Sequence, residues 1–138
     1  MGYGEKQGRM MNLRLFSIAA LLLLPALLLA ASDGAWLRRV PDEDRARRNP
    51  VAGQAQAASA GQKTFLENCA KCHGTDAMGL RNRPGLRSER IRHAKDGEIF
   101  WMLEHGNPYL GMPPWASLSE QTRWQVIAYI RSLPPASR

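Results

Sequence analysis

Cysteine is scarce in this chain of 138 residues, which contains only two, both within a single five-residue segment. So few cysteines exclude a framework of several disulfide bonds, and a zinc site built from two cysteine pairs lacks its second pair. Strand-like alternation, internal repeats and a cluster of acids, bases and nucleophiles are missing as well. We therefore predict a fold without β-sheet and a protein that is not an enzyme.

Long apolar runs are limited to one, near the N-terminus. Residues 15–31 are almost entirely apolar, follow Arg9 and Arg14, and precede small residues suited to signal-peptidase cleavage after Ser32. We predict that residues 1–32 are a signal peptide or an uncleaved membrane anchor. Either form places the rest of the chain in the periplasm, because the two arginines keep the N-terminus on the cytoplasmic side.

Acidic residues are outnumbered, with 12 Asp and Glu against 19 Lys and Arg and a formal net charge of +7. A basic chain can bind nucleic acid, an anionic membrane surface or an acidic protein. Export makes nucleic acid an unsuitable partner. The charge therefore indicates association with a membrane or with acidic proteins.

The chain leaves room for one small domain. Residues 33–58 are polar and rich in alanine and are interrupted by Pro41 and Pro50, which predicts a polar linker or a loop lying over the domain. Trp36 is the residue of this segment that suggests docking. The domain itself then occupies residues 59–138, and a core this small usually gains stability from a disulfide, a metal or a large apolar cofactor.

Apolar residues at helical spacing predict three helices in this domain. Ser59 and Gln62 form a capping-box pattern at the start of the first helix. The expected helices run from about Ala60 to Lys71, from Asp96 to Gly106 and from Ser119 to Leu133. The segments between them are rich in glycine and proline, so we expect loops there.

Both cysteines fall in Cys69-Ala70-Lys71-Cys72-His73, the C-x-x-C-H pattern typical of c-type haem attachment. Each thiol can add to one haem vinyl group as a thioether, and the adjacent histidine can then reach the iron from the same side. The motif predicts one covalently bound haem c held by Cys69 and Cys72, with His73 as an iron ligand.

Other interpretations of the motif explain less. A redox-active cysteine pair would need a thioredoxin-like βαβ context, and a structural disulfide leaves His73 to coincidence. A zinc site would need a fourth ligand. We therefore interpret the segment as a haem attachment site.

Met112 is the strongest candidate for the second axial ligand. It lies between Gly111 and two prolines, so it cannot belong to a helix or a central strand, where methionine usually serves as core. Met102 falls on the apolar face of the second helix and is most simply a core residue. His105 is the main alternative ligand to Met112.

From about Ser59 to Leu133 the chain resembles a class I, single-haem cytochrome c domain, in which the attachment motif, a methionine loop and a closing helix occur in the same order. The resemblance implies a small all-α domain around the haem, in which the first and last helices cross. By the same resemblance, Gly61 and Phe65 correspond to the packing pair of the first helix. Val126 and Tyr129 correspond to that of the last.

The resemblance also implies a role for Pro84: its carbonyl would accept a hydrogen bond from the proximal histidine and so fix the orientation of the histidine ring. The alternative is a plain turn proline. The loop around Pro84 departs from the common family pattern in its arginines. Trp115 could line the haem or hydrogen-bond a propionate, although aromatic residues at such positions are often only packing residues.

An iron held by His and Met on both faces has no open position for a small-molecule substrate, so the predicted function is the transfer of single electrons between redox partner proteins. Two alternatives remain. The chain could be the haem-bearing subunit of a larger respiratory or dehydrogenase complex, or, with Met112 absent from the iron or easily displaced, a haem enzyme or gas sensor.

Basic residues crowd the segment between the attachment motif and the second helix, where only Glu89 opposes them before Asp96. They are Arg81, Arg83, Arg87, Arg90, Arg92 and Lys95. Complementary charge raises association rates between electron carriers. We therefore expect an acidic docking face on the redox partner, the alternative being a solvated basic loop.

Overall fold

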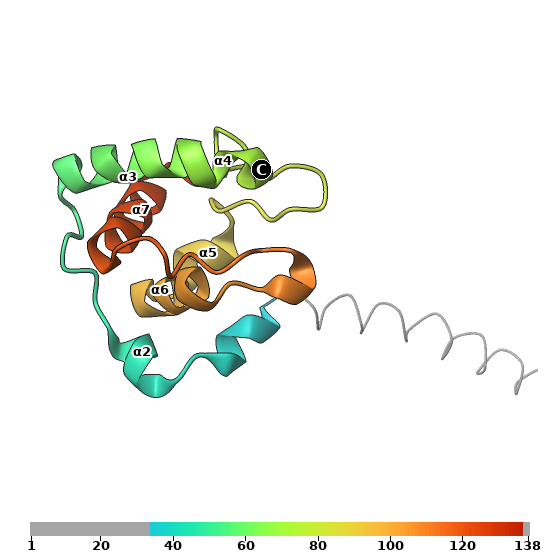
Figure 1. Ribbon diagram of the computed structural model, residues 1–138. Helices are drawn as coiled ribbons and strands as arrows, with labels where there is room; N and C mark the ends of the chain where they lie inside the picture. Colours follow the sequence, from blue (N-terminus) through green and yellow to red (C-terminus); the bar gives the residue numbers. More distant parts are fainter. Residues whose placement is uncertain (1–33, 137–138) are drawn as a thin grey trace, which may run out of the picture. The chain divides into compact units, whose positions relative to one another are not determined.

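The structure, a computed structural model, describes residues 34–136, and its regular elements are helices (Figure 1). They are η1 (Ala35–Arg39), α2 (Asp42–Ala46), α3 (Ala55–Asn68), α4 (Ala70–His73), α5 (Glu89–His93), α6 (Asp96–His105), η2 (Pro108–Leu110) and α7 (Glu120–Ser132). The prediction of an all-helical domain is confirmed. The predicted signal peptide or anchor lies outside the described residues, and none of the described helices is both long and apolar enough to cross a membrane.

Helices α3 and α7 cross at close range, as Figure 1 shows. Gly61 lies against the backbone of α7 at Gln125, which a larger residue could not do. Beside this contact, the rings of Phe65 and Tyr129 pack with their centroids 5.2 Å apart, and Phe65 is completely buried. The two packing pairs implied by the resemblance therefore lie at the crossing. Helix α3, which forms one side of the crossing, leads directly into α4.

The larger part of the core lies between α6 and α7. Phe100 stacks on Trp124 with ring centroids 4.1 Å apart, and Ile127 is fully buried beside them. Ser119 caps α7 by accepting a hydrogen bond from the backbone N–H of Thr122 at 3.1 Å. Ser119 at the start of α7 and Gly106 at the end of α6 lie where the sequence predicted, because both residue types mark helix ends. The N-cap of α6 is Lys95, one residue before the Asp96 from which the cap was expected.

Residues 36–54 pack on α6. The Arg45 guanidinium donates to the buried Glu98 carboxylate at 2.7 Å and also to the carbonyl of Leu37 at 2.9 Å. Asn49, itself buried, donates to the carbonyl of Trp124 at 3.0 Å. Trp36, the residue expected to suggest docking, packs on the α6–α7 core together with Leu37 and Val51. The segment that we predicted to be a polar linker or overlying loop therefore carries η1 and α2 and is docked by both polar and apolar contacts.

The start of the first helix was predicted wrongly. Helix α3 begins at Ala55, after the N-cap residue Gln54, whose side chain makes no capping hydrogen bond. Ser59 therefore lies inside the helix and is not its cap. The alanine-rich turn from Ala55 to Ser59 buries only Ala57 and so carries almost no apolar periodicity in the sequence.

Candidate functional site

Helix α4 is a single turn that presents both cysteines and the histidine of the motif together. It follows α3 directly: the N–H of Cys69 still donates to the carbonyl of Phe65 at 2.8 Å. The N–H groups of Cys72 and His73 then both donate to the carbonyl of Cys69, at 3.1 and 3.0 Å. The α3–α7 crossing thus fixes the position of this turn through the end of α3.

The two thiols are not joined by a disulfide. Cys69 is buried, Cys72 is partly buried, and the burial of Cys69, together with the nearby Cys72, raises the pKa of the Cys69 thiol to about 11. At neutral pH the Cys69 sulfur is therefore largely protonated, which disfavours metal binding as a thiolate. Within residues 34–136, no group of three or more His, Cys, Asp and Glu side chains could hold a metal ion, so a zinc site has no ligand set there.

The His73 ring is oriented by the loop that follows α4. Its Nδ1 atom lies 2.9 Å from the carbonyl oxygen of Pro84. When Nδ1 carries the proton it donates to this carbonyl, and Nε2 is left with a free lone pair that can bind a metal. This is the pair of residues for which the resemblance implies a hydrogen bond. The loop itself is closed by bonds from Gly79 N–H to His73 O and from Leu86 N–H to Ala77 O, both 2.8 Å long.

Met112 lies in a second loop, between η2 and α7. Its N–H and carbonyl form an antiparallel bridge with Asn107, with hydrogen bonds of 3.0 and 2.8 Å, and its side chain is partly buried against the α6–α7 core. Trp115 is likewise partly buried against this core, and its N–H donates to the carbonyl of Leu103 at 2.7 Å. The loop that carries both residues is therefore anchored to the end of α6.

His105, the alternative iron ligand, lies at the end of α6. Its ring stacks on Trp101 with centroids 4.4 Å apart, and its Nδ1 atom is 3.0 Å from the carbonyl of the same residue. The side chain is thus engaged along the surface of its own helix. Met102, which was expected to be a core residue, is only partly buried on the same helix.

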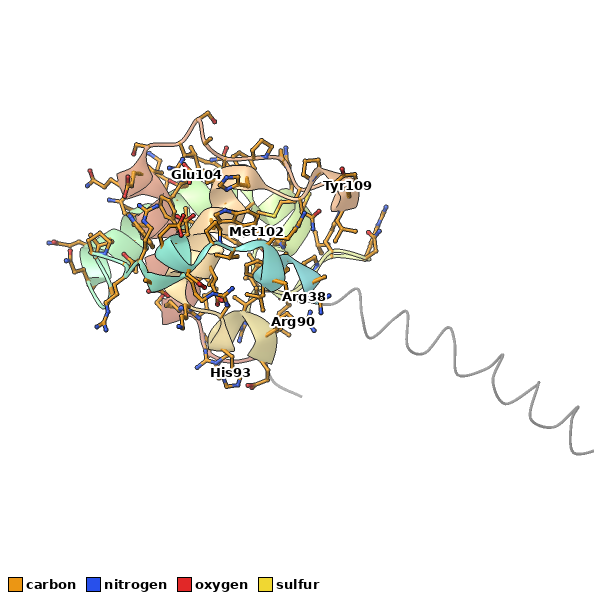
Figure 2. The ribbon with its side chains drawn as sticks, turned by 90° about the horizontal axis from the view of Figure 1, so that it is seen from below. Arg38, Arg90, His93, Met102, Glu104 and Tyr109 are labelled. Atoms are coloured by element: carbon orange, nitrogen blue, oxygen red, sulfur yellow. The ribbon has the colours of Figure 1, made fainter. Side chains whose placement is uncertain are left out.

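The loop after α4 and the loop that carries η2 extend to the same side of the domain, as Figure 1 shows. A hollow of about 370 Å³ lies beside α4 and is lined by Lys71, Cys72, Leu80, Arg81, Asn82 and Arg83. Several large apolar side chains of these two loops are exposed: Met78, Leu80, Tyr109 and Leu110. Figure 2 shows Tyr109 at the outer edge of its loop, and 93% of this residue is exposed.

These residues fit a haem c. Two thiols at the attachment spacing, an imidazole with a free nitrogen and a thioether in a second loop are the donors that such a group requires, and the two loops carry exposed apolar side chains. Arg83 was not singled out as a site residue from the sequence, yet its guanidinium reaches from the first loop to the carbonyl of Leu110 in the second. The only signal in the sequence was its position directly before Pro84.

The basic segment after α4 is less uniform than its sequence suggests. Arg87 donates to the carbonyls of Pro134 at 2.7 Å and Pro135 at 3.1 Å and so ties the chain beyond α7 to this loop. Arg87 therefore has a structural role, whereas the sequence suggested only that it helps to bind an acidic partner. Arg81 and Arg92 are exposed, and His93 pairs with Glu89 at 3.2 Å at the outer edge of α5 (Figure 2).

Comparison with known proteins gives a family for most of this domain. The family model for cytochrome c oxidase, cbb3-type, subunit III matches residues 56–130. Cytochrome c-554(547) of Halothiobacillus neapolitanus is 36% identical over 87 residues, which cover 55% of this chain and 96% of that cytochrome.

Longer relatives match over the same region. The cbb3-type cytochrome c oxidase subunit FixP of Sinorhizobium medicae is 33% identical over 93 residues, which cover 60% of this chain and 32% of the subunit. The chain thus spans about a third of the length of that oxidase subunit. The crystal structure of cytochrome cL from Methylophaga aminisulfidivorans matches with a TM-score of 0.55 at 24% identity, over 63% of this chain and 59% of that one, and shows the same fold.

Proposed function

Because this chain belongs to the cytochrome c family, in the group of the cbb3-type oxidase subunit III, we propose that it is an exported monohaem cytochrome that carries single electrons between protein partners. One haem c is attached through thioethers to Cys69 and Cys72, and its iron is held by His73 and Met112. The observation that carries this proposal is the geometry of α4, which presents both thiols and an oriented imidazole on one helical turn.

A haem bound there supplies the reversible one-electron chemistry of its iron. The chain's own residues do the rest. Pro84 fixes the orientation of the His73 ring by accepting a hydrogen bond from Nδ1, which leaves Nε2 to face the iron. The α3–α7 crossing fixes the position of α4 through the end of α3, and with it the position of both thiols and of His73.

Met112 is preferred to His105 as the second ligand for a structural reason. Met112 stands in a loop on the same side of the domain as the loop of Pro84. Its thioether sulfur is only a weak hydrogen-bond acceptor, so it gives up little by binding iron. His105 already stacks on Trp101 and pairs with its carbonyl. Trp115, three residues after Met112, packs on the α6–α7 core and so supports the methionine loop.

A second candidate function is that of a haem-bearing subunit in a larger respiratory complex, because the matched FixP protein is an oxidase subunit. Similarity over almost the full length of cytochrome c-554(547) favours the small carrier. In either case the partner is a redox protein, and the exposed Lys71 and Arg81 beside the hollow favour a partner with an acidic docking face. We place the domain in the periplasm on the basis of the export signal in the sequence.

The experiment that tests the proposal compares Met112→Ala with Met102→Ala in the haem-loaded protein. Met112→Ala should abolish the weak long-wavelength sulfur-to-iron absorption of the oxidised form, lower the reduction potential and open the ferrous iron to carbon monoxide. Met102→Ala should change none of these. Carbon monoxide binding by the unmodified protein at neutral pH would instead indicate a haem enzyme or a gas sensor.

A further inference from the structure

Arg83 connects the two loops that carry the proposed iron ligands. Its Nη1 atom donates to the carbonyl of Leu110, 27 residues further along the chain. Its guanidinium also covers Gly111: Nη1 and Nη2 lie 3.0 and 3.1 Å from the position that a Cβ atom of Gly111 would occupy. The side chain therefore contacts the residues directly before Met112.

The other end of Arg83 is fixed beside the proximal histidine. Its N–H donates to the carbonyl of Leu80 at 2.9 Å, which closes a turn, and the next residue is Pro84, whose carbonyl meets His73. Arg83 also lines the hollow together with Cys72, one of the two thiols of the motif. One side chain thus links the backbone that orients His73 with the backbone that presents Met112.

The sequence supports this link at both ends. Gly111 has a φ of +73°, in the left-handed region that favours glycine, and the absence of a side chain leaves space for the guanidinium above its Cα. Arginine suits the position because its planar fork can donate to one carbonyl while its face covers a neighbouring peptide. A lysine could supply the charge but not this extended contact.

The opposite flank of the methionine loop is held separately. Arg123 on α7 donates to the carbonyls of Leu118 at 3.0 Å and Trp115 at 3.4 Å, so the residues after Met112 are tied to the core. Arg83 holds the residues before Met112 and ties them to the histidine loop. Loss of Arg83 would therefore remove the link between the two loops, while the Asn107–Met112 bridge and Arg123 still hold the methionine loop on the domain.

We propose that Arg83 is a positioning residue that keeps Met112 on the iron by coupling the methionine loop to the histidine loop. The inference rests on the proposed function, because it takes Met112 as an axial ligand. Its consequence is measurable: in the haem-loaded, oxidised protein, loss of the link should make Met112 easier to displace by an added ligand. The iron–histidine side is retained, because the His73–Pro84 contact does not involve the Arg83 side chain.

The test is an imidazole titration of the oxidised, haem-loaded protein, followed through the long-wavelength sulfur-to-iron band. Arg83→Gln should bind imidazole about tenfold more tightly than the unmodified protein, as expected when one charge-assisted hydrogen bond to the loop is lost. Arg83→Lys should fall between the two. Arg81→Gln, which removes the same charge from an exposed residue of the same loop, is the matched control and should titrate like the unmodified protein.

Equal titration curves for Arg83→Gln and Arg81→Gln would overturn the proposal, since charge alone would then account for any effect. If Arg83→Gln yielded no haem-loaded protein, the decision would rest on Arg83→Lys, and a curve identical to that of the unmodified protein would reject the link. A failure of the proposed function would give a different result: the unmodified protein would lack the sulfur-to-iron band before any imidazole is added.

Discussion

Gly61 approaches Gln125 so closely that a methyl group on its Cα would stand 1.9 Å from the Gln125 carbonyl oxygen. This contact sets the distance between α3 and α7 and allows the Phe65 and Tyr129 rings to meet beside it. Because α4 continues directly from α3, the position of the haem attachment motif depends on a crossing that only glycine permits.

Gly61→Ala should lower the free energy of unfolding by about 2 kcal/mol or more, because the helices must separate to admit the methyl group. Chemical denaturation followed by circular dichroism measures this change. Gln62→Ala, an exposed substitution on the same helix, should change the stability by less than about 0.5 kcal/mol. A Gly61→Ala variant as stable as the Gln62→Ala variant would show that the two helices do not meet as described.

Arg45→Met should destabilise the domain by about 2 kcal/mol, since it leaves the buried Glu98 carboxylate without its cationic partner. The expected cost is below that of a fully buried pair, because the Arg45 side chain is 32% exposed and Glu98 also accepts from the Lys95 N–H at 2.7 Å. Asp42→Asn is the control: Asp42 is 3.7 Å from the same arginine but fully exposed, so its loss should have almost no effect. Equal denaturation midpoints for the two variants would mean that residues 36–54 are only a loose tether.

Arg81→Glu should slow electron transfer with the native partner at low ionic strength while leaving the haem spectrum unchanged, because it reverses a charge beside the haem site. Stopped-flow measurement of the bimolecular rate over a range of salt concentrations provides the test. Arg48→Glu makes the same charge change on the segment between α2 and α3, away from α4 in Figure 1, and should have a smaller effect. Arg87 is unsuitable for this purpose because it bonds to Pro134 and Pro135. If the transfer rate depended on neither salt nor the Arg81 substitution, Arg81 would be only a solvated surface residue with no role in docking.

The sequence predicted the structure correctly at positions where a residue type or a short motif has one usual structural or chemical role. The C-x-x-C-H segment indicated haem attachment without any structure, and Ser119 and Gly106 marked helix ends because capping and left-handed turns favour those residues. The start of α3 was missed because alanine and glutamine near Gln54 carry no such signal. Helix α5, only five residues long, was missed because so short a segment shows no clear period.

Arginine was the least predictable residue. In the sequence Arg83, Arg87 and Arg131 look like parts of a charged surface, yet each donates to backbone carbonyls far away in the chain. Nothing local encodes these partners, because a carbonyl is available at every residue and the guanidinium has many donors. Similarly, the docking of residues 36–54 combines isolated apolar side chains such as Trp36 with single polar contacts such as that of Asn49, and neither leaves a periodic pattern.

The central claim is that Cys69 and Cys72 hold one haem c covalently, and mass spectrometry of the denatured, acid-acetone-extracted protein tests it most directly. The predicted result is a chain heavier by one haem, with the added mass confined to the peptide that contains Cys69 to His73. Cys69→Ser and Cys72→Ser should each leave at most one thioether and give less folded protein. A full-length chain that loses all its haem to the solvent would contradict the claim.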